Sequence, residues 1–412
     1  MKKLLLTIAF ALFCLNPVFA QGKSETTSGP VEIEYFNMKS ETQDIMAHLI
    51  SAFEMKNPDI KVIQTNTPDA QTVFKTRLAA HDIPDIVNVY PASNMYKQYF
   101  RDGFLANLDG ESFLEHIPDA TLALSQDDGK NFCLPMTMSV YGIYVRTDLL
   151  AKYGLKEPTT YPELIHVCKV LQKNGIIPIA FSDKATWTIG QILERLIGVI
   201  DNNSDAEFQR IADGTLSAQD SPILNTFARM MIELHQYSYP DTMAVSYEDS
   251  LSDVVSGKCA MVIMGSWALG TMETSDPTID DRIELIPFPN PTDKKTKVPV
   301  NVDTAFAISN TTKHKEACER FLSFLAEKSQ AQYYADHEKT PNVVKGVTYS
   351  IEPHKQLVEY LAEGNIFLSP VVIWPDGLRD QLKIPAQQLY IDHNVETFLE
   401  SCGKMIKNYY NQ

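Results

Sequence analysis

The strongest constraint on the fold is an uninterrupted apolar run from Cys259 to Met264, followed by Gly265-Ser266-Trp267. Six apolar residues are too few for an ordinary helix, and they lack the alternation of a strand with one wet face. Such a run indicates a strand covered on both faces, at the centre of an α/β sheet. Gly265 and Ser266 turn the chain, so Trp267 follows at the carboxyl end of the strand, where open α/β sheets place their ligand crevices. The indole of Trp267 is then either the floor of a binding site or a core aromatic.

The first hundred residues alternate strand and helix patterns. The strands predicted along the whole chain include 31–36, 60–64, 83–90, 140–145, 259–264, 283–288 and 301–308. Helices are predicted between the first three of these strands, at 42–56 and 74–80. Strand, helix, strand, helix, strand is the βαβ pattern, which places parallel strands in one sheet with helices on both faces. The sequence therefore predicts an α/β fold.

The first twenty residues have the pattern of a secretory signal. Two lysines precede an apolar run from residue 4 to residue 15, and Val18-Phe19-Ala20 is a small-x-small ending. We interpret residues 1–20 as a signal peptide and 21–30 as a flexible leader, and expect the protein in the periplasm or at the cell exterior. No segment reaches the roughly 20 apolar residues of a transmembrane helix. Cys14 offers a second interpretation, a lipid anchor, which the bulky residues before it disfavour.

Length, charge and cysteine content limit which kinds of protein this chain can be. Without the signal, 392 of the 412 residues remain, which at about 150 residues per domain suggests two domains. The whole chain has a formal charge of −16, and because the signal holds two lysines the remainder has −18, which argues against nucleic acid as a partner. The five remaining cysteines form no CxxC pair, so we expect buried free thiols, no metal site and no cofactor, although one disulfide stays open. They are Cys133, Cys168, Cys259, Cys318 and Cys402.

Six motifs follow one another along nearly the whole chain after the signal. They are Pro84-Asp85-Ile86-Val87, residues 102–109, residues 134–150, residues 158–164, residues 257–267 and residues 315–325. In this order they resemble the family 1 extracellular solute-binding proteins of ABC importers, the group of maltose-binding and multiple-sugar-binding proteins. Two positions depart from the family pattern: Tyr161 stands where Trp is usual, and Arg146-Thr147 where Asn-Lys is frequent. Neither position is expected to touch ligand.

The resemblance implies a two-lobed periplasmic-binding-protein fold of type II, each lobe a sheet flanked by helices, with the ligand in the cleft between them. The motifs divide the chain into an N-terminal lobe of residues 31–137 plus 303–340 and a C-terminal lobe of residues 138–302 plus 341–412. The implied function is a substrate-binding component, a monomer and not an enzyme. It closes on a carbohydrate and delivers it to transmembrane permease subunits with a cytoplasmic ATPase behind them. Residues 175–187 resemble the oligosaccharide-binding branch, which favours a di- or oligosaccharide.

A sugar presents hydroxyl groups and an apolar C–H face, so its site needs flat aromatic surfaces and fixed polar groups. Aromatic residues at strand ends and loop breaks are the first candidates. They are Tyr90, Trp187, Trp267 and Trp374. Trp267 matches a stacking position in the family, and core packing is the alternative for each of the four.

The polar candidates lie in loops and at the predicted crossovers. They are Asn37, Glu41, Ser93, Asn301, Asp303 and Asp376. For each carboxylate the alternative is a solvated loop residue or a helix cap. Asp183, just before Trp187, is either a further contact for a hydroxyl or part of a surface pair, and Asp85 is expected to be structural.

Two other functions stay open on the sequence alone. Secreted glycoside hydrolases also place two carboxylates in an aromatic-lined cleft. The chain has no Gly-x-Ser-x-Gly elbow, no HExxH and no phosphate-binding glycine loop, which disfavours most hydrolytic chemistry but not that class. A binding protein for a non-sugar ligand, such as a polyol, is the other alternative.

Overall fold

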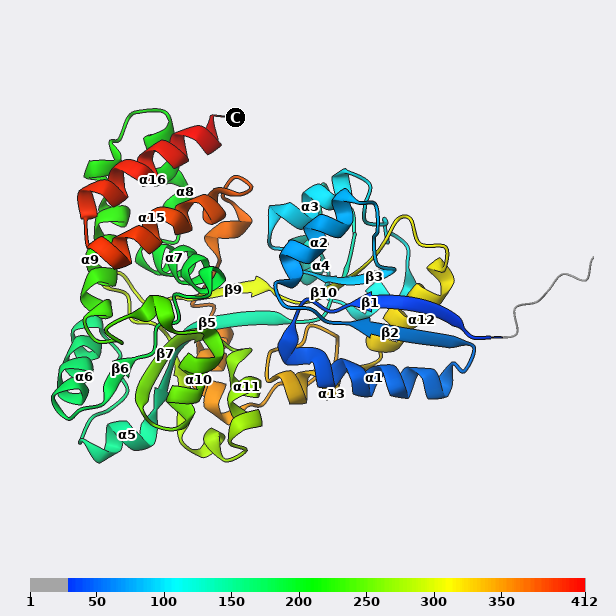
Figure 1. The fold of residues 1–412 in the computed structure, drawn as a ribbon, viewed down its shortest axis with the longest axis horizontal. Coiled ribbons are helices and arrows are strands. Elements are labelled where there is room, and N and C mark those ends of the chain that lie inside the picture. Colours follow the sequence, from blue (N-terminus) through cyan, green and yellow to red (C-terminus); the bar gives the residue numbers. More distant parts are fainter. Residues whose placement is uncertain (1–28, 412) are drawn as a thin grey trace, which may run out of the picture.

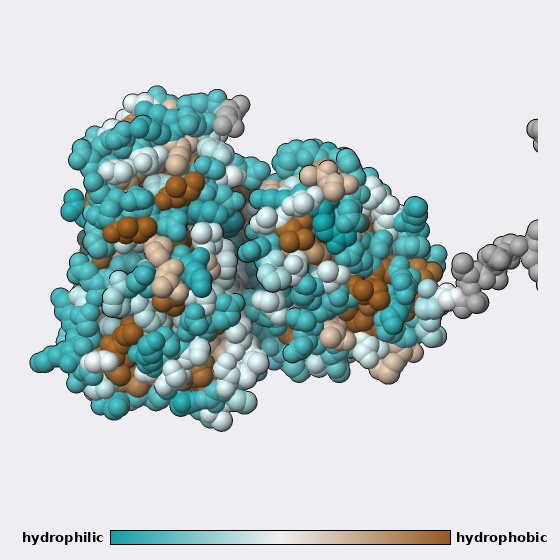
Figure 2. Space-filling model, in the orientation of Figure 1, coloured by the Kyte–Doolittle hydropathy of each residue, from teal (hydrophilic) through white to brown (hydrophobic). Residues whose placement is uncertain are grey.

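The computed structural model describes residues 29–411. The predicted signal peptide, Cys14 and most of the predicted leader lie outside these residues. The described chain forms two lobes, each built on its own sheet, which confirms the predicted two-lobed α/β fold (Figure 1). In the space-filling view a groove separates the lobes, and hydrophilic residues cover most of the visible face (Figure 2).

The first lobe contains a five-stranded sheet in the order β2-β1-β3-β10-β4. Its strands are β1 (Val31–Phe36), β2 (Ile60–Thr65), β3 (Ile86–Val89), β4 (Leu134–Pro135) and β10 (Ala305–Ile308). β1 pairs parallel to β2 and to β3, as the βαβ pattern predicts. β10 returns from far along the chain and pairs antiparallel to β3 and β4. The carboxyl ends of β1 and β3 therefore lie at one edge of the sheet, on the side of the second lobe (Figure 1).

Helices cover both faces of this sheet. They are α1 (Gln43–Lys56), α2 (Ala70–Ala79), α3 (Asn94–Arg101), α12 (Lys315–Leu325) and α13 (Lys328–Glu338). α1, α12 and α13 cover one face, where Phe53 packs edge to face on Phe321 and Phe324. α2 and α3 cover the other face with Phe74 and Tyr96 (Figure 1). Because helices bury both faces of this sheet, the ends of its strands remain accessible, and a ligand site can form there.

The second lobe is built around β7, as the apolar run in the sequence predicts. Its sheet runs β11-β9-β5-β7-β6, with β8 paired to β5. The strands are β5 (Met138–Arg146), β6 (Ile177–Ile179), β7 (Cys259–Gly265), β8 (Ile283–Ile286), β9 (Val298–Val302) and β11 (Ile366–Leu368). All seven residues of β7 are buried. The single strand predicted at 301–308 is wrong, because Asp303 and Thr304 separate β9 from β10 and the two strands belong to different sheets.

Helices pack around the sheet of the second lobe. They include α6 (Tyr161–Lys173), α7 (Thr186–Ile200), α9 (Pro222–His235), α10 (Tyr247–Val255), α11 (Ala268–Ser275), α15 (Leu378–Asp392) and α16 (Val395–Tyr410). The predicted start of α6 is confirmed, since the Thr160 side chain accepts from the Glu163 amide and the Glu163 carboxylate accepts from the Thr160 amide. Within residues 29–411, no helix combines the length and the apolar composition that crossing a bilayer requires. The five cysteines of this part of the chain are buried free thiols.

Three segments connect the lobes and meet at Thr137. The amide of Asp303 donates to the Thr137 carbonyl at 2.8 Å, and the amide of Thr137 donates to the Thr304 carbonyl at 3.1 Å. On the other side, the amide of Met138 donates to the Pro341 carbonyl at 2.8 Å. These bonds hold the three segments, which we call the crossovers, side by side. Any rotation of one lobe against the other must bend all three together.

The third crossover stays with the first lobe beyond residue 341. The amide of Val343 donates to the Met136 carbonyl at 2.9 Å, and Val343 and Val344 pack in the core of the first lobe. Ile351 packs against the core of the second lobe. Beyond Val344, the amide of Lys345 donates to the His116 carbonyl at 2.8 Å and the amide of Thr348 donates to the Gln332 side chain at 2.9 Å, both in the first lobe. The chain thus changes lobes between Thr348 and Ile351.

The pairing of β5 with β8 depends on a glycine. A Cβ atom on Gly142 would lie 2.2 Å from the carbonyl oxygen of Ile286, and this oxygen belongs to the paired strand. We expect Gly142→Ala to lower the free energy of unfolding by about 1–3 kcal/mol, because the backbone must shift to relieve the overlap. Urea denaturation measures this. Gly190→Ala in α7 is the control, since its Cβ would lie 3.8 Å from the nearest atoms, which belong to the Arg379 side chain, and a helical Gly→Ala change adds stability. Equal effects of the two substitutions would contradict the account.

Candidate ligand site between the lobes

The loop after β1 lies at the carboxyl end of its strand and is shaped by Asn37. The Asn37 side chain donates to Thr42 Oγ1 at 3.2 Å and accepts from the Lys39 amide at 3.0 Å. With an exposed fraction of 1%, Asn37 itself is buried, whereas Glu41 is half-buried. Of these two predicted site residues, the structure therefore leaves Glu41 accessible and uses Asn37 to build the loop.

Tyr90 and Ser93 follow β3 at the same edge of the sheet. Both are half-buried, and the Ser93 amide donates to the Tyr90 carbonyl at 2.9 Å. Burial raises the pKa of the Tyr90 hydroxyl, and the charges of Lys39, Asp303 and Glu41 also act on it. Tyr90 therefore lies within electrostatic reach of Glu41 and Asp303.

An aromatic pair on the second lobe lies opposite this loop. Trp187, at the start of α7, is 40% exposed, and its ring packs edge to face on Tyr247 with the ring centres 5.0 Å apart. Burial raises the pKa of Tyr247, and after burial the largest contribution is the charge of Glu41. Glu41 and Tyr247 belong to different lobes, so this coupling places the loop and the aromatic pair across from each other.

A second contact between the lobes lies near Trp374. The Asn94 side chain donates to the Trp374 carbonyl at 3.1 Å. Asp376, which is exposed, is close enough to Tyr99 for its charge to add to the burial that raises the pKa of Tyr99 to about 12. The Trp374 indole, however, is 1% exposed and stacks on Phe208 at 5.0 Å. The structure thus brings Asp376 to the edge between the lobes, while the Trp374 ring fills the core behind it.

Trp267 lies at the end of β7, as predicted, but its indole is 5% exposed. It packs directly over Gly265, where a Cβ would overlap the ring, and its centre is 6.0 Å from that of Tyr141. The guanidinium of Arg195 lies 5.9 Å from the Trp267 ring and 4.8 Å from that of Tyr141. Trp267 therefore packs with Tyr141 and Arg195 in a buried layer below the strand ends of the second lobe. Asn301 on β9 is 6% exposed, and its side-chain oxygen has no hydrogen-bond partner among the described residues.

A group of buried polar side chains lies beside this layer. The sequence analysis named one of them, Asp183, but its alternative of a surface pair is wrong because Asp183 is buried, and Glu194 was missed. Glu194 and Asp183 are 0% exposed, and each uses one carboxylate oxygen on a neighbour: Glu194 on Arg195, and Asp183 on His235 at 3.0 Å. Within the described chain the other oxygen of each carboxylate, and the hydroxyl of Tyr390, have no partner. The signal that could have found Glu194 is the pair Glu194-Arg195 inside an otherwise apolar helix. Unpaired buried polar atoms cost about 1–3 kcal/mol each, so a cluster of them indicates a function.

A buried ion group joins the loop to the crossovers. Lys39 donates to Asp303 at 2.7 Å and also to Glu338, whose side chain is fully buried. Burial raises the pKa of Glu338 to about 7, opposed by the charge of Lys39 and reinforced by that of Asp303. The second oxygen of the Glu338 carboxylate has no partner within residues 29–411. Asp303, a predicted ligand residue, is thus engaged by Lys39 through one of its oxygens.

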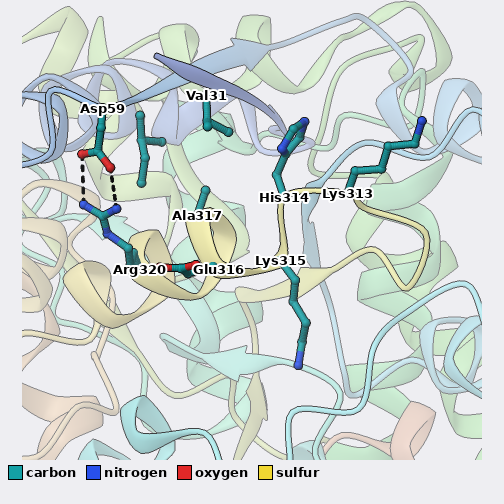
Figure 3. A pocket seen from close by; sticks show the side chains of 9 residues that line it. Val31, Asp59, Lys313, His314, Lys315, Glu316, Ala317 and Arg320 are labelled. Atoms are coloured by element: carbon teal, nitrogen blue, oxygen red, sulfur yellow. Dashed lines mark hydrogen bonds and ion pairs between the residues drawn. The ribbon is translucent and has the colours of Figure 1, made fainter. Parts of the chain in front are cut away.

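A shallow depression on the first lobe is separate from this site. It has a volume of about 280 Å³ and lies at the start of β1, next to Val31 and His314 (Figure 3). Asp59 and Arg320 pair across its rim at 2.7 Å. Because β1 has six residues at about 3.3 Å each, this depression lies at the opposite end of the strand from Asn37.

Two α/β lobes joined by three crossovers, with polar and aromatic side chains gathered from both lobes at the edge between them, define a two-lobed solute-binding protein. The chain belongs to the bacterial extracellular solute-binding proteins, whose family model matches residues 39–332. This confirms the resemblance seen in the sequence.

Relatives and solved structures agree with this assignment. The multiple sugar-binding protein of Streptococcus mutans is 30% identical over 331 residues, which cover 79% of this chain and 78% of the relative. The structure of RafE in complex with raffinose has a TM-score of 0.84 at 22% identity, covering 92% of this chain and 99% of RafE. The apo form of RafE from Streptococcus pneumoniae has a TM-score of 0.73 at 22% identity, covering 93% and 98%.

The ion group predicts a pH dependence of stability. Because the pKa of Glu338 is about 7 in the folded protein and near 4.5 in the unfolded chain, the folded state keeps a proton that the unfolded state releases. This stabilisation is complete below pH 4.5 and is lost as the pH rises through 7. Relative to Glu338→Gln, which cannot titrate, we expect the free energy of unfolding of the wild type to fall by about 3 kcal/mol between pH 4.5 and pH 8. Urea denaturation across this range measures it, and parallel pH profiles for the two proteins would contradict it.

Proposed function

We propose that this protein is the extracytoplasmic substrate-binding component of an ABC importer and binds a carbohydrate, a di- or oligosaccharide, between its lobes. The observation that carries the proposal is that Glu41 of the first lobe lies across from the Trp187–Tyr247 pair of the second lobe, at the edge where the lobes meet. Trp187 presents 40% of its surface, and within the second lobe Asp183 and Glu194 each keep one oxygen without a partner among the described residues. Sugar hydroxyls donate to such oxygens, and sugar C–H faces stack on such rings.

The site takes residues from both lobes. On the first lobe the accessible residues are Glu41, Tyr90, Ser93 and Asp303, on a loop built by Asn37. On the second lobe they are Trp187 and Asp376, with Tyr247 buried against the Trp187 ring and with Trp267 and Asn301 in the layer below. Trp374 is not in the proposed set, because its ring is buried against Phe208.

The relatives support a sugar of more than one unit. RafE was solved in complex with raffinose, which is a trisaccharide. The arrangement of the lobes in this chain is more similar to the raffinose complex, with a TM-score of 0.84, than to apo RafE, with 0.73. We infer that the described conformation is near the closed one. Ligand then stabilises it by contacts that the open state lacks.

The lobe division of 31–137 plus 303–340 and 138–302 plus 341–412 is part of the proposal, except that residues 341–348 move with the first lobe. In the closed form the two lobes present one surface to the transmembrane permease, behind which the ATPase lies. We propose that the ligand is delivered unchanged, without turnover. The signal interpretation places this step in the periplasm or at the cell exterior, with the protein a monomer.

A thermal-shift screen against mono-, di- and trisaccharides, including raffinose, tests the ligand class. A ligand that binds only the folded state must raise the melting temperature by mass action. We expect clear shifts with one or a few oligosaccharides and no product by chromatography. Consumption of a sugar would establish a glycoside hydrolase instead, and shifts with polyols alone would establish a non-sugar binding protein.

Two tryptophans give a matched test of the site. Trp187→Ala is expected to weaken binding of the sugar found in the screen by about 30-fold or more, with little change in stability, because the ring is exposed at the edge between the lobes. Trp374→Ala is expected to lower the free energy of unfolding by about 3–5 kcal/mol, because it empties a core position. Calorimetry measures the first effect and urea denaturation the second. The reverse pattern would exchange the roles assigned to the two residues.

A further inference from the structure

The ammonium group of Lys39 donates all of its N–H hydrogens to other residues of the protein. Its Nζ donates to Asp303 Oδ2 at 2.7 Å, to Thr304 Oγ1 at 3.2 Å and to Glu338 Oε1. An ammonium group has three hydrogens and no acceptor, and the side chain is 5% exposed. A lysine in the loop that lines the proposed site therefore has no N–H left for a ligand.

The three partners of Lys39 all belong to the crossovers or adjoin them. Asp303 and Thr304 form the second crossover, and Glu338 is the last residue of α13, just before the third. The backbone of Lys39 meanwhile holds the loop: its amide donates to Asn37 Oδ1 at 3.0 Å and its carbonyl accepts from the Thr42 amide at 3.1 Å. One residue thus joins the loop to the segments about which the lobes turn.

We propose that Lys39 is a positioning residue, which holds the 37–42 loop in its ligand-binding conformation through Glu338 and Asp303 without touching the ligand. This inference rests on the proposed function, because it takes the loop to be part of a carbohydrate site. The ion group holds one ammonium between two carboxylates. Removal of Lys39 breaks the three bonds that tie the loop to Asp303, Thr304 and Glu338 and leaves the two buried carboxylates without a cation, so the loop is no longer held.

The groups around the ion group do not replace its cation. Those whose charge or titration couples to Lys39 or Glu338 are Glu41 from the loop, Tyr35 from β1, Tyr90 after β3, Tyr334 from α13, Tyr247 from α10 and Tyr349 after the third crossover. All are carboxylates or phenols. Lys339, the next cation along α13, is paired with Glu273 of α11 at 3.0 Å.

A conservative substitution provides a rescue test, with raffinose as the probe and calorimetry as the measurement. We expect Lys39→Met to weaken raffinose binding by about tenfold or more, because Met donates no hydrogen bond to Asp303, Thr304 or Glu338. Lys39→Arg keeps the positive charge and the N–H donors, so we expect its binding to lie within about threefold of that of the wild type. Circular dichroism checks that both variants are folded, and a folded Lys39→Met variant that binds raffinose within about threefold of the wild type would overturn the proposal.

A second measurement needs no ligand. Hydrogen exchange of the ligand-free full chain, followed by mass spectrometry, reports how well residues 37–42 are held. We expect faster exchange in this loop for Lys39→Met and recovery in Lys39→Arg, which keeps the cation. Glu273→Gln is the matched control, since it removes a neighbouring carboxylate of an ion pair but no contact of Lys39, and it should leave the loop unchanged. Wild-type exchange of the loop in Lys39→Met would overturn the proposal. Failure of wild-type protein to bind raffinose would count against the proposed ligand class, and the exchange result would still decide the role of Lys39.

Discussion

The hydrogen bonds around Thr137 are the constraint on which the arrangement of the two lobes depends. They hold three crossovers side by side, although these come from residues near 137, 303 and 341. The strand ends of both sheets therefore meet along one line, and the loops that follow them supply the candidate site. Lys39 reaches from one of these loops to the second and third crossovers, so the local shape of the site and the geometry of the hinge are joined by a single side chain.

The second lobe contains buried polar groups that are only half satisfied. Asp183 and Glu194 are 0% exposed, and each has one oxygen engaged and one without a partner in the described chain. Each such oxygen lowers stability, and the large core around it offsets this cost. We propose that hydroxyl groups of a sugar satisfy these oxygens in the ligand-bound protein. We infer that the protein gives up stability where it must recognise a ligand rich in hydroxyl groups.

The sequence predicted the parts of the fold that depend on local pattern. The buried strand at 259–264, the parallel pairing of the first strands and the capping box at Thr160 follow from periodicity and hydrogen-bonding residue types, and all three are present. The division of 301–308 between two sheets was missed, because two short apolar strands with two polar residues between them have the same composition as one strand.

Site residues were harder to predict, because the relevant information is three-dimensional. The sequence could place Glu41, Tyr90 and Trp187 at strand ends or loops, and these positions do lie at the edge between the lobes. It could not distinguish Trp374 from Trp187, since both follow short strands near a turn, and only the packing of Trp374 on Phe208 separates them. Nor could it find Glu338, which ends an ordinary amphipathic helix and gains its role by contact with Lys39, 299 positions away in the chain.

The most direct test of the central claim is a crystal structure of the protein with an oligosaccharide that raises its melting temperature. The account predicts electron density for the sugar between Glu41 of the first lobe and the Trp187–Tyr247 pair of the second, with at least one sugar hydroxyl on a carboxylate of Asp183 or Glu194. Density for the sugar on one lobe alone, or on an outer face such as the depression at the start of β1, would contradict it.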